Sequence, residues 1–481
     1  MKRPTPNPRR RLLVALAGTM LTAPGLPRAA TRIVLDAART NADATRGYID
    51  LPGFAASRKN TGIAVHAIDD TSLLDAARTN ADATRGYIDL PGFAASRKNT
   101  GIAVHAIDDT SLLDAVKDAG FSFVRADLFW EAVDTPHGWD FSRYDTLVAE
   151  LSERGLGALF ILGGIHRVHS PNRPPTTPAQ LAAFRRYVFN AAQRYKGKPV
   201  RFEVWNEQDH KTYWHGEPSP VAYRNVLKLA VQAVKAADPD AIVATGGVQQ
   251  VNRTFIRAVG DIASPAQPAP DAVSVHPYRQ TEPETVFADY AALRRDLSSY
   301  RRPPQIWATE WSYPSYGYNY VADIGDGHSS VARARQANYA VRLLLANWIS
   351  QIGLTSYYDI RDDGRDRTNM EHNFGLLDAD DAPLPAYIAV RRLFAFTADA
   401  VRARYFLDPD ARYVVLKLSA ARATKYALWC YGDGNAISVD LSRLPAGATV
   451  TNMYGAALDA GNRRRLDVPE ARGPVFITIE A

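Results

Sequence analysis

Two glutamates, each at the end of a short apolar run, are the residues of this sequence best suited to chemistry. Glu207 closes the segment 203–207 (EVWNE) and Glu310 closes the segment 306–310 (IWATE), and both segments are typical of short buried strands. Cleavage of a glycosidic bond needs one carboxyl group that protonates the leaving oxygen and a second that attacks the anomeric carbon or activates water. Two glutamates at the ends of two separate strands therefore indicate two-carboxylate chemistry on a sugar.

A third glutamate, Glu203, begins the first of these segments. Strand alternation places it on the same side as Trp205 and Glu207, so we expect it to face the interior of the protein and to pair with Arg125 rather than to react. Aromatic residues near both reactive glutamates are suited to exclude water and to stack on sugar rings: Trp205, Trp214, Trp307, Trp311 and Tyr313.

The elements that must position these residues alternate between short apolar runs and helical patterns from about residue 100 onward. Such alternation is typical of a parallel sheet with helices packed outside it. Cap signals support the pattern, because Thr177-Pro178 and Ser219-Pro220 each open a helix. We expect strands at 100–105, 121–127, 158–162, 200–205, 241–245, 272–276, 305–309 and 354–358. Eight strand–helix units predict an α/β fold, a (β/α)8 TIM barrel, with its active site at the carboxyl ends of the strands.

The pattern changes after about residue 400. Apolar or alternating runs at 412–418, 425–431, 436–441, 449–454 and 475–480 are separated by glycine-rich turns. They predict a small antiparallel β-sandwich domain that braces the barrel. The expected organisation is a signal peptide at 1–30, an N-terminal segment at 31–99, a catalytic barrel at 100–398 and the β-sandwich at 399–481.

The N-terminal segment contains an exact repeat. Residues 35–76 recur letter for letter as residues 74–115. Structural repeats normally diverge in sequence, and two copies are too few for a solenoid, so a recent tandem duplication or an assembly error is the expected origin. The second copy continues directly into the barrel and should serve as structure. We expect the first copy, about 35–73, to be loosely packed or displaced.

The charge and the single cysteine restrict the environment of the protein. The net charge is +6, and the six positive charges before residue 31, where no acidic residue occurs, account for all of it. A basic nucleic-acid surface is therefore not indicated. Three arginines at 9–11 precede an apolar run at 12–23, which is too short to span a bilayer and is typical of an export signal. We expect a bacterial protein that is periplasmic or secreted, without a membrane span once the signal is removed. Cys430 alone forms no intrachain disulfide and is expected to be buried.

Three stretches now carry a resemblance to a known family. They are 123–130 (FVRADLFW), 202–207 (FEVWNE) and 374–378 (FGLLD) followed by Pro385-Ala-Tyr387. Together with the second strand-end glutamate, they make residues 100–481 resemble glycoside hydrolase family 39, a family of (β/α)8 retaining glycosidases, and especially its bacterial branch that acts on exopolysaccharides.

This resemblance implies a role for each matching residue. Glu207 would be the general acid/base and Glu310 the nucleophile, while Asn206 would hydrogen-bond the 2-hydroxyl of the sugar. The remaining positions would bind substrate or hold the nucleophile: Arg125 would keep Glu310 ionised, His276 and Tyr278 would orient Glu310, His105 and His166 would line the subsite on the non-reducing side, and Trp311 would contact the sugar.

The sequence leaves several alternatives open. Inverting chemistry would need a wider separation of the two carboxyl groups. A carbohydrate-binding barrel without turnover, in an exopolysaccharide export or biofilm system, and a hydrolase that trims polymer during export both fit the pattern. The acidic loop 359–366 contains interleaved arginines, which favour ion pairs over a metal site. The reaction needs no cofactor. The expected partner is a polysaccharide or oligosaccharide, and the sugar, the linkage, endo or exo action and the oligomeric state stay open.

Overall fold

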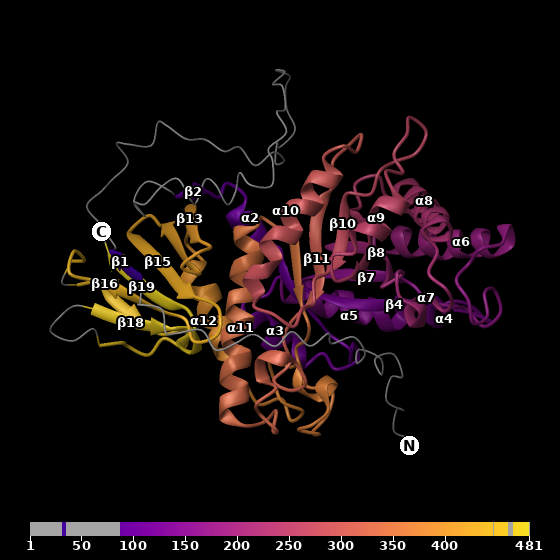
Figure 1. Ribbon diagram of the computed structural model, residues 1–481. Coiled ribbons are helices and arrows are strands. Elements are labelled where there is room, and N and C mark those ends of the chain that lie inside the picture. Colours follow the sequence, from indigo (N-terminus) through magenta and orange to yellow (C-terminus); the bar gives the residue numbers. More distant parts are fainter. Residues whose placement is uncertain (1–30, 35–86, 446, 460–464, 481) are drawn as a thin grey trace.

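The computed structural model describes residues 31–34, 87–445, 447–459 and 465–480. Within them, a barrel of strands surrounded by helices lies beside a domain built of strands, and the long helix α11 (Ser330–Ile349) runs between the two (Figure 1). This arrangement confirms the predicted fold class. The predicted signal peptide and the first copy of the repeat lie outside the described residues.

The barrel is a closed sheet of eight parallel strands. In sheet order they are β3 (Thr100–Ala103), β4 (Phe123–Phe129), β7 (Gly157–Gly163), β8 (Val200–Asn206), β9 (Val243–Gln249), β10 (Ala272–His276), β11 (Gln305–Trp311) and β12 (Leu354–Tyr357). Every predicted strand is present, with bounds shifted by a few residues.

The inside of the barrel changes from apolar to polar along the strands. Near their amino ends, one apolar cluster is formed by Phe123, Leu159, Ala244, Ala272, Trp307 and Leu354. Two residues further along β4, on the same face of that strand, stands Arg125. The polar residues therefore lie toward the carboxyl ends of the strands, which is where (β/α)8 enzymes build their active sites.

Helices cover the outside of the barrel. They are α3 (Leu112–Ala119), α5 (Ser142–Glu153), α6 (Pro178–Arg194), α8 (Pro220–Ala237), α9 (Arg253–Val259), α10 (Val286–Leu297), α11 and α12 (Pro385–Thr397), with the shorter α2 (Phe93–Lys98), α4 (Trp130–Val133) and α7 (Lys211–Trp214). The Thr177 side chain accepts a hydrogen bond from the backbone N–H of Gln180 and forms a capping box, and Ser219 caps α8. Short 3₁₀ helices η2 (Pro283–Thr285), η3 (Asn319–Val321), η4 (Met370–Asn373) and η5 (Glu470–Arg472) and the hairpin of β5 (Asp134–Thr135) and β6 (Gly138–Trp139) complete the connections.

The second domain is a sandwich of two sheets that share one apolar core. The larger sheet has the order β17 (Thr449–Thr451), β19 (Val475–Glu480), β15 (Ala423–Cys430), β14 (Tyr413–Ser419), β13 (Arg402–Asp408), β2 (Ile88–Asp89), and the smaller has the order β1 (Thr31–Val34), β16 (Ala436–Asp440), β18 (Arg465–Pro469). Strands β1 and β2 come from the N-terminal segment, and β1 pairs in parallel with β16. The N-terminal segment, which the predicted organisation set apart from the sandwich as residues 31–99, therefore supplies one edge of each sheet.

A buried ionic network joins the two domains. Arg342 on α11 binds both oxygens of Glu284, at 2.9 and 2.7 Å, and one oxygen of Glu470 at 2.5 Å. The indole N–H of Trp429, in β15, donates to Glu284 at 2.6 Å. Arg342, Glu284 and Trp429 are all buried. The charges are thus paired across the interface, as buried charges must be.

Among the described residues, no helix has the length and apolar character needed to cross a membrane.

Candidate active site

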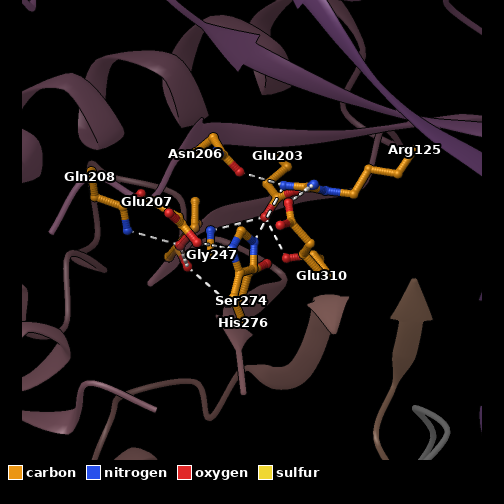
Figure 2. A network of polar contacts seen from close by, with 12 residues as sticks. Arg125, Glu203, Asn206, Glu207, Gln208, Gly247, Ser274, His276 and Glu310 are labelled. Carbon is orange, nitrogen blue, oxygen red and sulfur yellow. Dashed lines mark hydrogen bonds and ion pairs between the residues drawn. The ribbon is translucent and has the colours of Figure 1, made fainter. Parts of the chain in front are cut away.

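Glu207 and Glu310 face each other at the carboxyl ends of β8 and β11 (Figure 2). Their side chains are buried, with residue exposures of 7 % and 4 %. One carboxylate oxygen from each, together with a ring nitrogen of His276, lies within 4.8 Å of the others. The barrel therefore brings two glutamates that are about 100 residues apart in the chain close enough to act on the same glycosidic bond.

Arg125 connects the polar residues of this site (Figure 2). Its Nε donates to Glu203 at 2.8 Å, its Nη1 to Glu310 at 2.9 Å and its Nη2 to the Oδ1 of Asn206 at 2.8 Å. Burial disfavours the Arg125 cation, but the charges of Glu203 and Glu310 outweigh burial and raise the pKa of its guanidinium above the ordinary value. Glu310 therefore lies against a permanent cation, which stabilises its ionised form.

Glu203 is fully buried and satisfied by the barrel itself. Besides Arg125, it accepts hydrogen bonds from the backbone N–H of Gly247 at 2.9 Å and from the Thr309 hydroxyl at 2.6 Å. No part of it is exposed to a ligand. The expectation that Glu203 faces the interior and pairs with Arg125 is confirmed.

The prediction that Trp205 shares a side with Glu203 and Glu207 is wrong. The backbone of Trp205 has φ 78°, and that of Glu207 has φ 48°. The left-handed residue interrupts the alternation of the strand, so Trp205 packs outward against Trp214 of α7 and Phe184 of α6, with ring centroids 5.1 and 6.2 Å away. As a consequence, Asn206 takes the inward position beside Arg125. Such strained backbone is tolerated where the surrounding structure requires it, commonly at functional sites.

His276 and Tyr278 reach different carboxylates. The Tyr278 hydroxyl donates to Glu310 at 3.1 Å, as predicted. The Nδ1 of His276, however, lies 3.0 Å from Glu207, so the predicted contact with the nucleophile is corrected to the other glutamate. The Nη2 of Arg125, which is only a donor, lies 3.4 Å from the Nε2 of His276. Nε2 therefore accepts, and Nδ1 carries the proton that is donated to Glu207.

Gln249 is a site residue that sequence reasoning missed. It is the last residue of β9, and its side-chain amide donates to the second oxygen of Glu207 at 3.1 Å. The only signal in the sequence is its position, since it closes the strand that neighbours the Glu207 strand in the barrel. With His276 on one oxygen and Gln249 on the other, the carboxyl group of Glu207 is fixed in orientation.

Of the other predicted substrate ligands, His105 lies at the surface and Trp311 lies in the core. His105 is half-exposed, lies 3.0 Å from Asp363 and 3.6 Å from Asp359, and lines a cavity of about 350 Å³ with them. Its sugar contact stays a prediction. Trp311 is fully buried, packed against Tyr313 under the guanidinium of Arg279, so the prediction that it contacts the sugar is wrong.

His166 is engaged within its own loop. Its Nδ1 accepts hydrogen bonds from the backbone N–H groups of Val168 and His169, at 3.1 and 3.2 Å, and its Nε2 lies 2.9 Å from the carbonyl oxygen of Asp134. Both ring nitrogens are therefore used within the protein, and the predicted place of His166 in the subsite on the non-reducing side stays a prediction. Because Nδ1 accepts, Nε2 carries the proton, which also argues against a metal ion among Asp134, His166 and His169 despite their proximity.

The acidic loop after β12 forms ion pairs, as expected. Arg361 binds Asp109 and Asp381, at 3.0 and 2.9 Å, and Arg365 binds Asp380. These arginines compensate the carboxylates that surround them, so the composition of the loop is explained without a cation.

Comparisons with known proteins agree with this geometry. The sequence model of the family described as "Cellulase (glycosyl hydrolase family 5)" matches residues 81–322. A family 39 glycoside hydrolase from Bacteroides cellulosilyticus WH2 is 22% identical with a TM-score of 0.66, covering 80% of this chain and 82% of that one. A monomeric β-xylosidase from Caulobacter crescentus CB15 is 18% identical with a TM-score of 0.58, covering 80% and 96%. Among curated proteins, none matches the chain significantly.

The family model spans half of the chain, and the chain therefore belongs to the family described as "Cellulase (glycosyl hydrolase family 5)" and is a glycoside hydrolase. The structural likenesses, at these low identities, show the fold, which is that of family 39 enzymes. The predicted resemblance to a family 39-like (β/α)8 glycosidase is confirmed at this level, and its substrate is a carbohydrate.

Proposed function

We propose that this glycoside hydrolase cleaves its substrate with retention of configuration, through a covalent glycosyl–enzyme intermediate. The observation that carries the proposal is the separation of the two glutamates, whose nearest oxygens lie within 4.8 Å. Retaining enzymes hold their carboxyl groups about 5–5.5 Å apart, whereas inverting enzymes leave about 6.5–9.5 Å for a water molecule.

In the first step, Glu310 attacks the anomeric carbon while Glu207 protonates the leaving oxygen. Arg125 and Tyr278 favour Glu310 as a carboxylate, because one supplies a cation and the other a hydrogen bond. Glu207 has no cation in contact with its oxygens in the described structure; its partners are His276 and the amide of Gln249. This difference in environment supports the proposed roles of Glu310 as nucleophile and Glu207 as acid.

In the second step, Glu207 acts as the base that activates water, and the ester at Glu310 is hydrolysed. Asn206 supports both steps. Its Oδ1 accepts from Arg125, which leaves the Nδ2 donors directed away from that contact and available for the 2-hydroxyl of the sugar. No cofactor takes part in either step.

The proposed substrate is a polysaccharide or oligosaccharide outside the cytoplasm. The export signal expected at residues 1–30 supports a periplasmic or secreted enzyme. The resemblance to the exopolysaccharide branch of family 39 supports a bacterial polymer as substrate.

A panel of aryl glycosides, alkyl glycosides and bacterial exopolysaccharides tests this proposal. We expect the wild-type protein to turn over at least one of them, with product of retained anomeric configuration by NMR, and Glu207→Gln and Glu310→Gln to lose at least 10³-fold in kcat/KM. An inverted product would refute the mechanism. Full activity in either variant would refute the assignment of that carboxylate, and binding without any turnover would favour a binding protein.

A further inference from the structure

The loop that follows Glu207 carries another carboxylate close to the acid/base. Asp209 is half-buried, and its Oδ1 accepts from the backbone N–H of Gln249 at 3.0 Å while its Oδ2 accepts from the Asn252 amide at 2.8 Å. Asn252 is fixed in turn, because its Oδ1 caps α9 by accepting from Phe255 at 3.1 Å. Asp209 thus ties the Glu207 loop to the end of β9 and the start of α9.

The same residue, Gln249, joins Asp209 to the reacting carboxyl group. Its backbone is held by Asp209 and its side-chain amide donates to Glu207 at 3.1 Å. Glu207 therefore has one arm of contacts through His276 and a second arm that runs through Gln249 to Asp209. Gln249 and Asp209 can therefore act on Glu207 without touching the substrate.

The charges around Glu207 come from several elements. In and beside the site stand Arg125 of β4, Glu203 of β8, His276 and Tyr278 at the end of β10, Glu310 of β11 and Asp209 of the Glu207 loop. Burial, together with the nearby charge of Glu207, raises the pKa of the Asp209 carboxyl above its ordinary value. The repulsion between two carboxylates acts equally on both, so an ionised Asp209 favours the protonated form of Glu207.

We propose that Asp209 and Gln249 are positioning residues that balance the protonation of Glu207 in opposite directions. The negative charge of Asp209 favours the protonated form that donates to the leaving oxygen. The amide of Gln249 donates to the carboxylate and favours the ionised form that later activates water. The inference rests on the proposed function, in which Glu207 must serve as acid and then as base.

The test is the pH profile of kcat/KM on an alkyl glycoside from the panel, because its poor leaving group requires an acid. Asp209→Asn removes the charge, so the alkaline limb should move to lower pH by about half a unit or more. Gln249→Leu removes the donor and keeps the backbone N–H that binds Asp209, so the limb should move to higher pH. Asp238→Asn is the matched control, since this buried aspartate accepts a backbone N–H at 3.2 Å in the turn before β9, at the far end of the barrel, and should leave the limb unchanged.

Shifts of the alkaline limb in opposite directions in the two variants would support the proposal, because a general loss of structure would not shift the limb down in one variant and up in the other. Unchanged limbs, or shifts of the same sign, would overturn it. If Asp209→Asn does not fold, the direction of the Gln249→Leu shift decides alone. Glu207→Gln distinguishes failure of this inference from failure of the proposed function. If Glu207→Gln loses turnover while both positioning variants keep unchanged limbs, only this inference fails. If Glu207→Gln keeps full turnover, the proposed function itself fails.

Discussion

Gly247 is the position at which one added methyl group should disturb the site most. It lies in β9, and an ideal Cβ built on it would stand 2.1 Å from the Nε2 and 2.3 Å from the Cδ2 of His276, and 2.9 Å from the Thr309 hydroxyl oxygen. Van der Waals contact needs about 3.5 Å, so Gly247→Ala requires a displacement of about 1 Å. His276 is fully buried, so it has little room to yield.

The displacement should break a defined contact. The hydrogen bond between His276 and Glu207 is 3.0 Å long, and an extra 1 Å takes it beyond hydrogen-bonding distance. Misplacement of a catalytic group by about 1 Å costs roughly 10²-fold in rate, and overpacking costs about 1–3 kcal/mol of stability. We therefore expect kcat/KM to fall by about 10²-fold, with the thermal midpoint lowered by a few degrees and the circular dichroism spectrum retained.

The assay is kcat/KM on the best substrate of the panel, beside the Tm of each protein. Gly325→Ala is the matched control, because the added methyl group meets nothing within 4 Å there and neither parameter should change. If Gly247→Ala keeps activity within about threefold of wild type, the close packing of β9 on His276 is not what fixes Glu207, and the reasoning fails.

Two further predictions concern stability. Burial raises the pKa of Asp362 to about 6, so between pH 4 and pH 6 the folded protein holds a proton that the unfolded chain has lost, and the contribution of this group to stability falls by up to about 3 kcal/mol as the pH rises through that window. The difference in unfolding free energy between wild type and Asp362→Asn should follow this fall, and a difference independent of pH would contradict it. Arg342→Met should cost about 3–5 kcal/mol in urea unfolding, because Glu284 and Glu470 lose their cation, and a cost under 1 kcal/mol would show that the network does not hold the domains together.

The barrel was predictable because its signals are local. Each strand is a short apolar run followed by a helix, and caps such as Thr177 announce their helices within a few residues. The sandwich was predictable only in part, since β1 finds its partner β16 about 400 residues later in the chain. No local pattern in a four-residue strand specifies such a partner, and sequence separation of this size is what makes strand pairing hard to read.

The parts of the site that depend on residue type were predictable, whereas the direction in which a side chain points was not predictable where it depends on backbone geometry. A carboxylate and an arginine that both face the inside of a barrel can be paired from the sequence, as Glu203 and Arg125 show. The outward turn of Trp205 depends on a single left-handed residue, and strict alternation fails there. Trp311 was misjudged for a related reason, because it directly follows Glu310 in β11 and neighbouring residues of a strand point to opposite faces.

The pairing of Arg125 with two glutamates has a consequence for the proposed reaction. When Glu310 becomes an ester in the covalent intermediate, it loses its charge. If Glu310 were its only partner, Arg125, which is 4 % exposed, would then be a buried cation without compensation. A buried charge that loses its partner costs about 3–5 kcal/mol, which would raise the barrier to forming the intermediate. Glu203 accepts hydrogen bonds from Arg125, Gly247 and Thr309 and takes no part in the proposed chemistry. It keeps Arg125 paired throughout the cycle, so the nucleophile is free to gain and lose its charge.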